Sequence, residues 1–273
     1  MVHNTADADP EAGRAGTTKL LGLDFSDLNV AETAAWIANR PADAPFGFVV
    51  TPNAEHLVRL AKQPELMAVY RQALLRLMDS RVVLRAAQLL GLPALSLVPG
   101  SDLTVELLTK HLRPDDRITV IGLWPRDLPL LKQRLPQAII SHYFPPLGFE
   151  RDETAFQKTA EFVVDHPARF YIFACGMPRQ ELLGARLKAC GNLHGTALCV
   201  GSALEFLIGS QQRAPVKMQR AGLEWLHRLC REPRRLGKRY LIQSPPIFTL
   251  LLRERIKLLK RRADATVDET GHS

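Results

Sequence analysis

The chain has 273 residues, 46% of them hydrophobic and 23% charged, so it has the length and composition of a globular protein with a sizeable core rather than those of a disordered chain. Its formal net charge of +8 is unevenly placed, because residues 211–273 hold 15 Lys and Arg against 6 Asp and Glu. The body is therefore nearly neutral, and the basic C-terminal part suggests a polyanionic partner: a phosphorylated ligand, a nucleic acid or an anionic membrane.

The first residues and the cysteines indicate a protein of the cytoplasm. Residues 1–18 are polar and acidic, unlike a signal peptide, and we expect them to be a disordered leader. The four cysteines (Cys175, Cys190, Cys199 and Cys230) form neither a CxxC pair nor a close group with histidine, so we expect buried thiols without a disulfide or a zinc site. No apolar run approaches the length of about 18 residues that a membrane span requires.

Residues 19–209 alternate between strand-like and helix-like patterns. Short runs rich in Val, Ile, Phe or Tyr predict strands covered on both faces at 46–51, 117–122, 138–144, 169–175 and 196–201. Helical patterns lie between them, at 53–77 with a break near Pro64, 102–112, 127–135, 152–166 and 179–190. This order predicts an α/β fold with a mostly parallel sheet and helices on both faces, in which ligands lie beyond the carboxyl ends of the strands.

Polar residues follow two of these apolar stretches. Thr51 and Asn53 can either cap the next helix or bond a ligand, and the two alternatives have about equal weight. Asp79 lies in a turn, where an aspartate usually bonds only its own backbone. Taken alone, Asp79 is therefore a weak candidate for catalysis.

Two glycine-containing turns follow the last two strands. Gly176 and Gln180 flank a proline at a helix start, an arrangement that suits either a plain helix start or a phosphate site. Glu205 lies among apolar residues, where an unpaired charge is costly. We therefore expect Glu205 to have a partner or to face the site.

From residue 210 the pattern changes to helices with basic faces. We place a helical appendage at 210–262 and a disordered tail at 263–273, and we expect one helix of the appendage to end at Pro233. Residues 245–262 mix apolar and basic side chains, as in a helix on an anionic membrane, although packing on the body is the alternative. The aromatic residues of this part suit packing better than base stacking, so we expect no nucleic-acid partner.

Four segments together resemble the WecB/TagA/CpsF glycosyltransferases: "TPNAEHLV", "GSDL" (100–103), "GMPRQE" and "RAP…Q…GLEWLHRL…EPRR…KRYL". The similarity runs from about Gly22 to Leu241. It implies a Rossmann-like domain with a C-terminal appendage that reaches the inner face of the bacterial cell membrane. It also implies metal-independent, inverting transfer of a hexosyl or N-acetylhexosaminyl group from a UDP-sugar to a polyprenyl-diphosphate-linked acceptor, in the synthesis of exopolysaccharide, capsule or a cell-wall polymer.

The resemblance assigns roles to individual residues. Asp79 matches the catalytic Asp, which as a general base would take the proton of the acceptor hydroxyl. Thr51, Asn53 and Gln180 match substrate-site residues. We also expect substrate contacts from Gly176, Glu205, Arg213, Arg220, Arg228 and Arg231, and phosphate or membrane contacts from Arg234, Arg235, Lys238 and Arg239. Arginines can stabilise a diphosphate in place of a metal, so no metal ligand and no cofactor beyond the nucleotide-sugar donor is expected.

The sequence departs from the family's pattern at four places: Ser80 replaces a glycine, Leu97 an arginine, Leu123-Trp124 a glycine pair and Glu205 an aspartate. These changes imply an altered donor or acceptor, or a weakened enzyme. The alternative is a non-catalytic relative that acts as a membrane-bound subunit of a polysaccharide assembly complex. The donor sugar, the acceptor saccharide and a homo-oligomeric state are left open.

Overall fold

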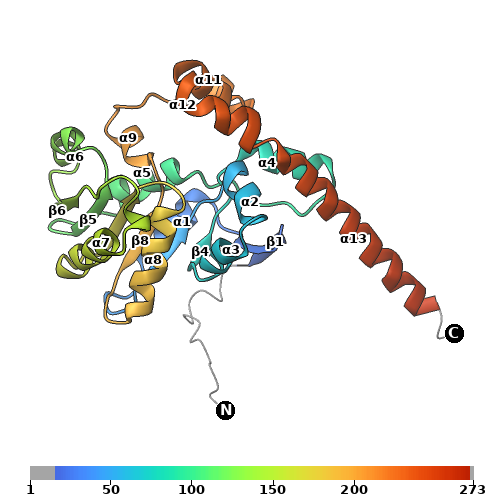
Figure 1. Ribbon diagram of the computed structural model, residues 1–273, viewed down its shortest axis with the longest axis horizontal. Coiled ribbons are helices and arrows are strands. Elements are labelled where there is room, and N and C mark those ends of the chain that lie inside the picture. Colours follow the sequence, from blue (N-terminus) through green and yellow to red (C-terminus); the bar gives the residue numbers. More distant parts are fainter. Residues whose placement is uncertain (1–15, 271–273) are drawn as a thin grey trace, which may run out of the picture.

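The computed structural model describes residues 16–270, without the side chains of Val216, Arg220, Arg235, Arg262, Ala263 and residues 265–270. Most of the expected leader and residues 271–273 of the expected tail lie outside the described residues. The centre of the fold is a six-stranded sheet in the order β4-β3-β8-β7-β5-β6, in which every pairing is parallel (Figure 1).

The strands of this sheet are β3 (Gly47–Val50), β4 (Leu75–Arg76), β5 (Arg117–Gly122), β6 (Ile139–Tyr143), β7 (Phe170–Ala174) and β8 (Thr196–Cys199). The five predicted strands are confirmed to within two residues at each end, and so is the α/β fold class. They were recognisable because strands covered on both faces are apolar throughout: β3 and β8 are buried along their whole length.

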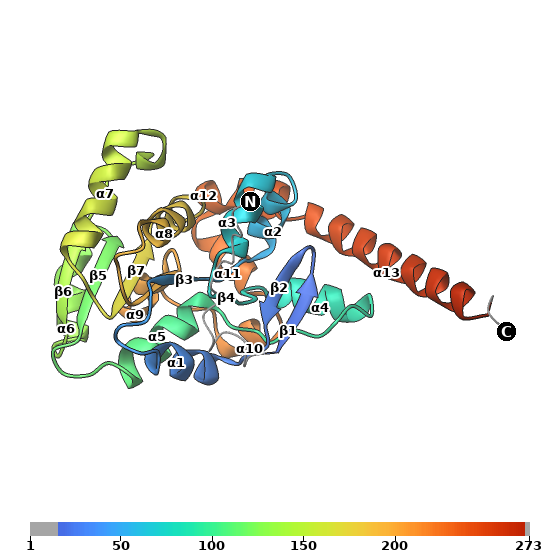
Figure 2. The same cartoon turned by 90° about the horizontal axis from the view of Figure 1, so that it is seen from below.

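Helices cover both faces of the sheet (Figure 2). One layer holds α2 (Ala54–Leu60), α3 (Pro64–Arg71), α7 (Glu153–Asp165) and α8 (Arg179–Cys190). The opposite layer holds α1 (Val30–Ala38), α5 (Gly100–Lys110), α6 (Leu128–Arg134) and α9 (Ala203–Leu207). Each layer encloses its own apolar core against the sheet. The predicted break near Pro64 is confirmed, since α3 begins there.

Several elements were not predicted. They are the hairpin of β1 (Thr17–Leu20) and β2 (Leu23–Ser26), the helix α1, the short strand β4, and α4 (Arg81–Leu89). β1 begins within the expected leader. The first hairpin strand is largely exposed and β4 has only two residues, so neither gives a long apolar run. The helical prediction for 53–77 is wrong at β4, which forms through its pairing with β3. This matters for the site, because β4 leads directly into Asp79.

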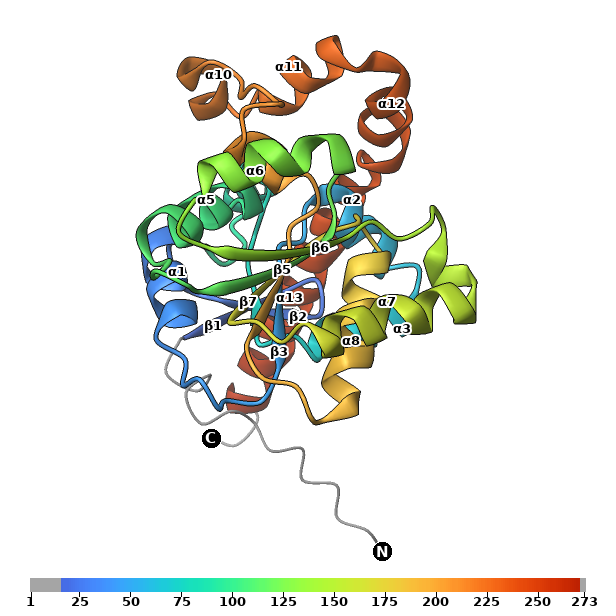
Figure 3. The ribbon, with the colours of Figure 1, turned by 90° about the vertical axis from the view of Figure 1, so that its left-hand side faces the viewer.

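The C-terminal part consists of α10 (Val216–Arg220), α11 (Glu224–Arg231), α12 (Pro233–Lys238), a π-helical turn (Arg239–Gln243) and α13 (Pro246–Thr270). Figure 3 shows α10, α11 and α12 above one end of the sheet. The predicted helix end is confirmed, since α11 stops before Pro233 and α12 begins with it.

Helix α13 packs on the body with its first turns, which was one of the two alternatives for residues 245–262, and it is longer than expected. Its first turns pack on α2 and α4, with Ile247 and Leu251 buried, whereas its later turns extend away from the body (Figure 1). It also continues to Thr270, through residues 263–270 that were expected in a disordered tail. The reason is local, because residues 263–270 contain neither Gly nor Pro to end the helix.

The expectation of four buried thiols is wrong for two of them. Cys199 is buried within β8 and Cys175 is half-buried, but Cys190 and Cys230 are exposed. Both exposed residues lie near the C-terminal ends of helices, where one face has no neighbouring layer.

Candidate active site

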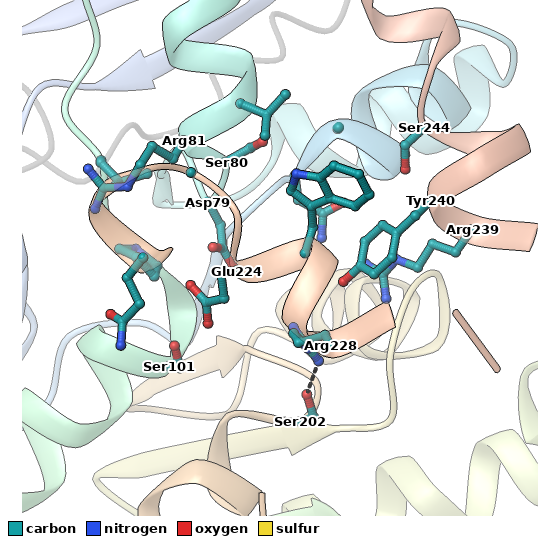
Figure 4. Close-up of a pocket in the computed structure, with 18 of the residues that line it drawn as sticks. Asp79, Ser80, Arg81, Ser101, Ser202, Glu224, Arg228, Arg239, Tyr240 and Ser244 are labelled. Atoms are coloured by element: carbon teal, nitrogen blue, oxygen red, sulfur yellow. Dashed lines mark hydrogen bonds between the residues drawn. The ribbon is translucent and has the colours of Figure 1, made fainter. Parts of the chain in front are cut away.

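A cavity of about 490 Å³ lies between the carboxyl edge of the sheet and the C-terminal helices (Figure 4). Its size is that of a small-molecule site. The sheet side supplies residues that follow β3, β4 and β8, and the C-terminal side supplies residues from α10 to α13. The appendage therefore closes a site that the α/β domain alone would leave open.

Four helices begin at this cavity. First-turn residues of α2, α4, α5 and α9 line it: Ala54, Arg81, Ser101 and Ala203. For α2, α4 and α9 the convergence follows from the parallel sheet, since every connection from a strand to its next helix leaves the sheet at the same edge. Helix α5 follows α4 and begins at this edge beside Asp79. Helix N-termini carry partial positive charge, so this wall of the cavity favours an anionic ligand.

Asn53 and Ser80 serve as helix caps. The Asn53 Oδ1 atom accepts hydrogen bonds from the backbone nitrogens of Glu55 (3.1 Å) and His56 (3.3 Å) at the start of α2. The Ser80 Oγ atom accepts one from Val83 N (3.3 Å) at the start of α4. Both residues also line the cavity. Asn53 therefore caps α2 and lies at the site as well, so the two alternatives for this residue are compatible.

Asp79 is held at the cavity by backbone contacts. Its backbone N–H donates to Pro52 O (3.0 Å), and its Oδ2 accepts from Gly100 N (3.3 Å) at the start of α5. Thr51 lies behind this contact and is buried, outside the cavity lining. A Cβ atom on Gly100 would lie 2.8 Å from Thr51 Oγ1, so the glycine permits the close approach that brings its N–H to Asp79.

The environment of Asp79 raises the pKa of its carboxyl group to about 7, chiefly because burial disfavours the charged form. The Gly100 N–H and the Arg228 cation oppose the rise, and the carboxylates of Glu224 and Asp102 add to it. Figure 4 shows Asp79 and Glu224 pointing into the same part of the cavity. A carboxyl group with a pKa near neutrality is suited to accept a proton during a reaction.

Two arginines occupy the same end of the cavity. Arg228 Nη2 lies 3.5 Å from Ser202 Oγ and 3.4 Å from Gln211 Oε1, and Arg213 forms an ion pair with Asp102. Both guanidinium groups lie 5.5 Å from the ring centre of Phe206. Among the described residues, neither Arg213 Nη2 nor Arg228 Nε has a hydrogen-bond partner, although both are buried. These donors are available to an anionic ligand.

The other end of the cavity is largely aromatic and aliphatic. Trp225 and Tyr240 meet edge to face, with ring centres 6.0 Å apart, and Ile247 and Phe248 of α13 continue this wall. Arg239 lies beside it, with its Nε atom 2.8 Å from Glu55 Oε2 of α2. The cavity is thus polar near Asp79 and apolar where α13 begins.

Gln180 and Gly176 lie outside the lining of the cavity. The buried Gln180 amide accepts through Oε1 from Gly176 N (3.2 Å) and Gly201 N (3.0 Å), which lie in the turns after β7 and β8. Its Nε2 donates to Glu181 Oε1 (2.9 Å). Gln180 therefore joins two loops at the carboxyl edge, and a substrate contact by Gln180 or Gly176 stays a prediction.

A buried polar chain behind Gln180 was not anticipated. The Tyr70 hydroxyl donates to Glu181 Oε1 (3.0 Å) and lies 3.2 Å from His56 Nδ1. Burial lowers the pKa of His56 to about 3, assisted by the positive charges of Arg239 and Arg59, so the ring is neutral at physiological pH. Burial likewise raises the pKa of Glu181. The sequence signal was present, since His56 and Glu181 belong to two of the motifs quoted above, "TPNAEHLV" and "GMPRQE".

The remaining predicted site residues lie elsewhere. Arg231 is exposed and donates to Gln212 Oε1 (2.9 Å), Arg234 and Lys238 are exposed, and Glu205 is half-buried outside the cavity lining. The side chains of Arg220 and Arg235 are outside the described part of the structure. Of the predicted residues, the cavity brings together Asn53, Asp79, Arg213, Arg228 and Arg239.

Several lining residues were not predicted. Ser101 and Asp102 belong to the quoted "GSDL" segment, and Glu224 and Trp225 to the quoted "GLEWLHRL" segment, but none of the four received a role in the site. Leu97 and Ser80, two of the departures from the family's pattern, do line the cavity. Trp124, a third departure, does not line it and is half-exposed after β5.

The described residues offer neither a metal-binding cluster nor a membrane-spanning helix. Within residues 16–270, no three His, Cys, Asp or Glu side chains gather in a way that would hold a metal ion. No described helix has both the length and the apolar character needed to cross a membrane.

Comparison with known proteins adds two findings. The model of the "Glycosyl transferase WecG/TagA/CpsF family" matches residues 18–261. The N-acetylglucosaminyldiphosphoundecaprenol N-acetyl-beta-D-mannosaminyltransferase of Staphylococcus aureus (strain MW2) is 25% identical over 260 residues, which cover 91% of this chain and 97% of that protein.

Proposed function

Because this chain belongs to the WecG/TagA/CpsF family of glycosyl transferases, we propose that it transfers a sugar from a UDP-sugar to a saccharide linked to a polyprenyl diphosphate. One observation carries the proposal: a carboxyl group with a pKa near neutrality and two arginines with unpartnered donors share one cavity. The name of the staphylococcal relative, which specifies a diphosphoundecaprenol acceptor, supports the acceptor class.

The proposed reaction is a single displacement with inversion at the anomeric carbon. Asp79 takes the proton of the acceptor hydroxyl while the hydroxyl oxygen forms the new bond to the anomeric carbon. The bond from that carbon to the diphosphate breaks, and the diphosphate leaves with the electron pair. Arg213 and Arg228 stabilise the charge on the leaving diphosphate, which places the nucleotide near the start of α9.

We propose that this chemistry needs no metal ion. Arg213 and Arg228 supply two positive charges at the polar end of the cavity, and the helix N-termini add their partial charges. Bidentate guanidinium groups suit a diphosphate and can take over the charge neutralisation that a divalent cation performs elsewhere.

The apolar end of the cavity indicates where the lipid-linked acceptor would enter. Leu241 and Phe248 line the cavity and are also exposed, at 64% and 51% of their surface. Further apolar side chains of the π-helical turn and α13 are exposed beside them, among them Ile242 (66%) and Leu252 (49%). We propose that this surface contacts the inner face of the cell membrane, with basic side chains such as Lys238 on anionic headgroups.

The membrane contact is tested by placing acidic residues at two of its apolar positions. The double variant Ile242→Asp, Leu252→Asp is expected to lower the partition coefficient on anionic phospholipid vesicles at least tenfold, because two apolar side chains no longer enter the interface. Vesicle sedimentation measures the effect, with Leu147→Asp as the matched control, since Leu147 is exposed at 93% in the loop after β6. Equal losses in both variants would argue against this surface.

The function itself is tested by sugar transfer. Purified protein, a synthetic polyprenyl-diphosphate-linked saccharide and a panel of radiolabelled UDP-sugars are incubated with EDTA, and the organic phase is counted. We expect one donor to label the lipid. Labelling only after a divalent cation is restored would refute metal independence.

A non-catalytic role as a subunit of a polysaccharide assembly complex is the second candidate. It is favoured by the positions of Ser80 and Leu97, since both departures from the family's pattern line the cavity beside Asp79. Failure of every donor to label the lipid, with vesicle binding intact, would support this second function.

A further inference from the structure

The sheet changes its winding direction between β5 and β7. From β5 the chain passes through α6 to β6 on one side, and from β7 it passes through α8 to β8 on the other. Helices α6 and α8 cover opposite faces of the sheet (Figure 2). In open α/β sheets such a switch point leaves a crevice beyond the carboxyl ends of the two strands, where nucleotides bind.

The turn after β5 is held in a constrained conformation at this point. Gly122 has a φ of +92°, and a Cβ atom there would lie 2.7 Å from Ala174 O at the end of β7. Leu123, a non-glycine residue, has a φ of +56°. His142 Nε2 donates to the carbonyl oxygens of Gly122 (2.7 Å) and Leu123 (3.0 Å), which fixes the turn from β6. Such strained turns persist where the surroundings hold them, often at functional sites.

The result of this turn is an exposed aromatic surface. Leu123 is buried at 5% exposure, and the next side chain, Trp124, is therefore directed outward and exposed at 51%. The Phe144 ring packs beside it, with ring centres 4.9 Å apart and an angle of 32° between the planes. The Arg126 guanidinium lies 5.6 Å from the centre of the Trp124 ring. Two packed and exposed aromatic rings offer a flat apolar face on which a ligand ring can stack.

We propose that Trp124 and Phe144 form the stacking platform for the nucleobase of the donor. The inference rests on the proposed function, since it assumes that the donor is a nucleotide sugar. Neighbouring strands lie about 4.8 Å apart, so β5 is about 10 Å from β8, a distance that a nucleoside diphosphate bridges. The base then lies at the switch point, the diphosphate near Ser202 and Arg228, and the transferred sugar near Asp79.

The chemistry of the platform favours a base with carbonyl oxygens. An aromatic face stacks on any base and by itself discriminates little. Arg126 adds only donors, because a guanidinium group has no acceptor. Uracil presents two carbonyl oxygens to such donors, which agrees with the UDP-sugar class of the proposed function.

Calorimetric titration of the full-length protein with UDP and with pyrophosphate tests the platform. Trp124→Ala is expected to raise the Kd of UDP about 5- to 150-fold, the loss that one base–aromatic stack carries, and to leave the Kd of pyrophosphate unchanged. Trp124→Phe keeps an aromatic face and is expected to retain most of the affinity. Leu147→Ala, from the neighbouring loop, serves as the matched control with wild-type affinity.

The kinetics of sugar transfer show whether Trp124 contacts the donor or the acceptor. Thermal melting confirms that each variant is folded. For Trp124→Ala we expect a higher KM for the donor and an unchanged KM for the acceptor. An unchanged Kd for UDP, a higher acceptor KM alone, or a loss confined to vesicle binding would each overturn the platform. If the wild type binds UDP in a Trp124-dependent way but transfers no sugar, the platform stands and the proposed function falls.

Discussion

Replacing Asp79 by Asn is expected to lower the kcat of sugar transfer by about 10²- to 10⁴-fold, the usual contribution of a general base. Asparagine retains the size and the hydrogen-bond acceptor that faces Gly100 N, so binding of the donor should change little. Initial rates at saturating donor and acceptor, read as label in the lipid fraction, measure the effect. Asp165→Asn, an exposed aspartate at the end of α7, is the control and should keep the wild-type rate.

The pKa of Asp79 also predicts the pH dependence of the wild type. The base must be unprotonated, so kcat/KM is expected to rise tenfold per pH unit below about 7 and to level off above that value. The free energy of unfolding is expected to fall over the same pH range in which the rate rises. The pKa of Asp79 is raised from its ordinary value of 3.8 to about 7 in the folded state, so this carboxyl group lowers the stability as the pH rises from about 3.8 toward 7. Asp79→Asn should therefore melt at a higher temperature than the wild type at pH 8, and the difference should shrink toward pH 4.

Equal transfer by Asp79→Asn and the wild type would remove Asp79 from the mechanism while leaving the transferase intact. A lower melting temperature for Asp79→Asn at pH 8 would contradict a net cost of burying the charged carboxylate. The two measurements are independent, since one follows the reaction and the other follows the folded state alone.

Replacing Arg228 by Ala is expected to lower kcat/KM for the donor by about 10²- to 10³-fold, as when a donor to a developing anion is lost. The positive charge and the planar guanidinium group of Arg228 both contribute to binding the leaving diphosphate. Arg228→Lys keeps only the charge and should therefore recover only part of the rate. Steady-state kinetics with the donor varied measure the effect. Arg134→Ala, from the exposed end of α6, controls for the loss of one positive charge.

Arg228→Ala should also move the acid limb of the pH profile. The cation lowers the pKa of Asp79 from within the cavity, so its removal should shift the half-maximal rate to higher pH. A purely structural role for Arg228 would lower the rate at every pH without this shift. An unchanged rate would exclude Arg228 from the stabilisation of the leaving group.

Both predictions depend on the appendage, since Arg228 and Glu224 come from α11 while Asp79 comes from the α/β domain. The domain alone offers Asp79, Asn53 and the helix N-termini to solvent. When α11 lies over them, it helps to bury Asp79 and adds the Arg228 cation and the Glu224 carboxylate, of which the carboxylate adds to the burial-driven rise in the pKa of Asp79. In the proposed reaction, one helix would therefore affect both the binding of the diphosphate and the transfer of the proton.

Local signals in the sequence were sufficient for the central strands and for two helix boundaries. The run at 117–122 is apolar because β5 is covered on both faces, and Pro64 and Pro233 each begin a helix because proline suits a first turn. The family membership was also readable, because its motifs are contiguous segments. The candidacy of Asp79 came from that resemblance rather than from its turn.

Only the tertiary structure decided which of the candidate residues meet. Asn53, Asp79 and Arg228 are far apart in the sequence and share one cavity because parallel strands end at one edge and the appendage folds over it. Gln180 lies near the same edge, but its amide is engaged by two loop N–H groups, a pairing that no local pattern records. Long-range contacts made by short strands and loops carry no periodic signal, so the lining of the cavity required the fold itself.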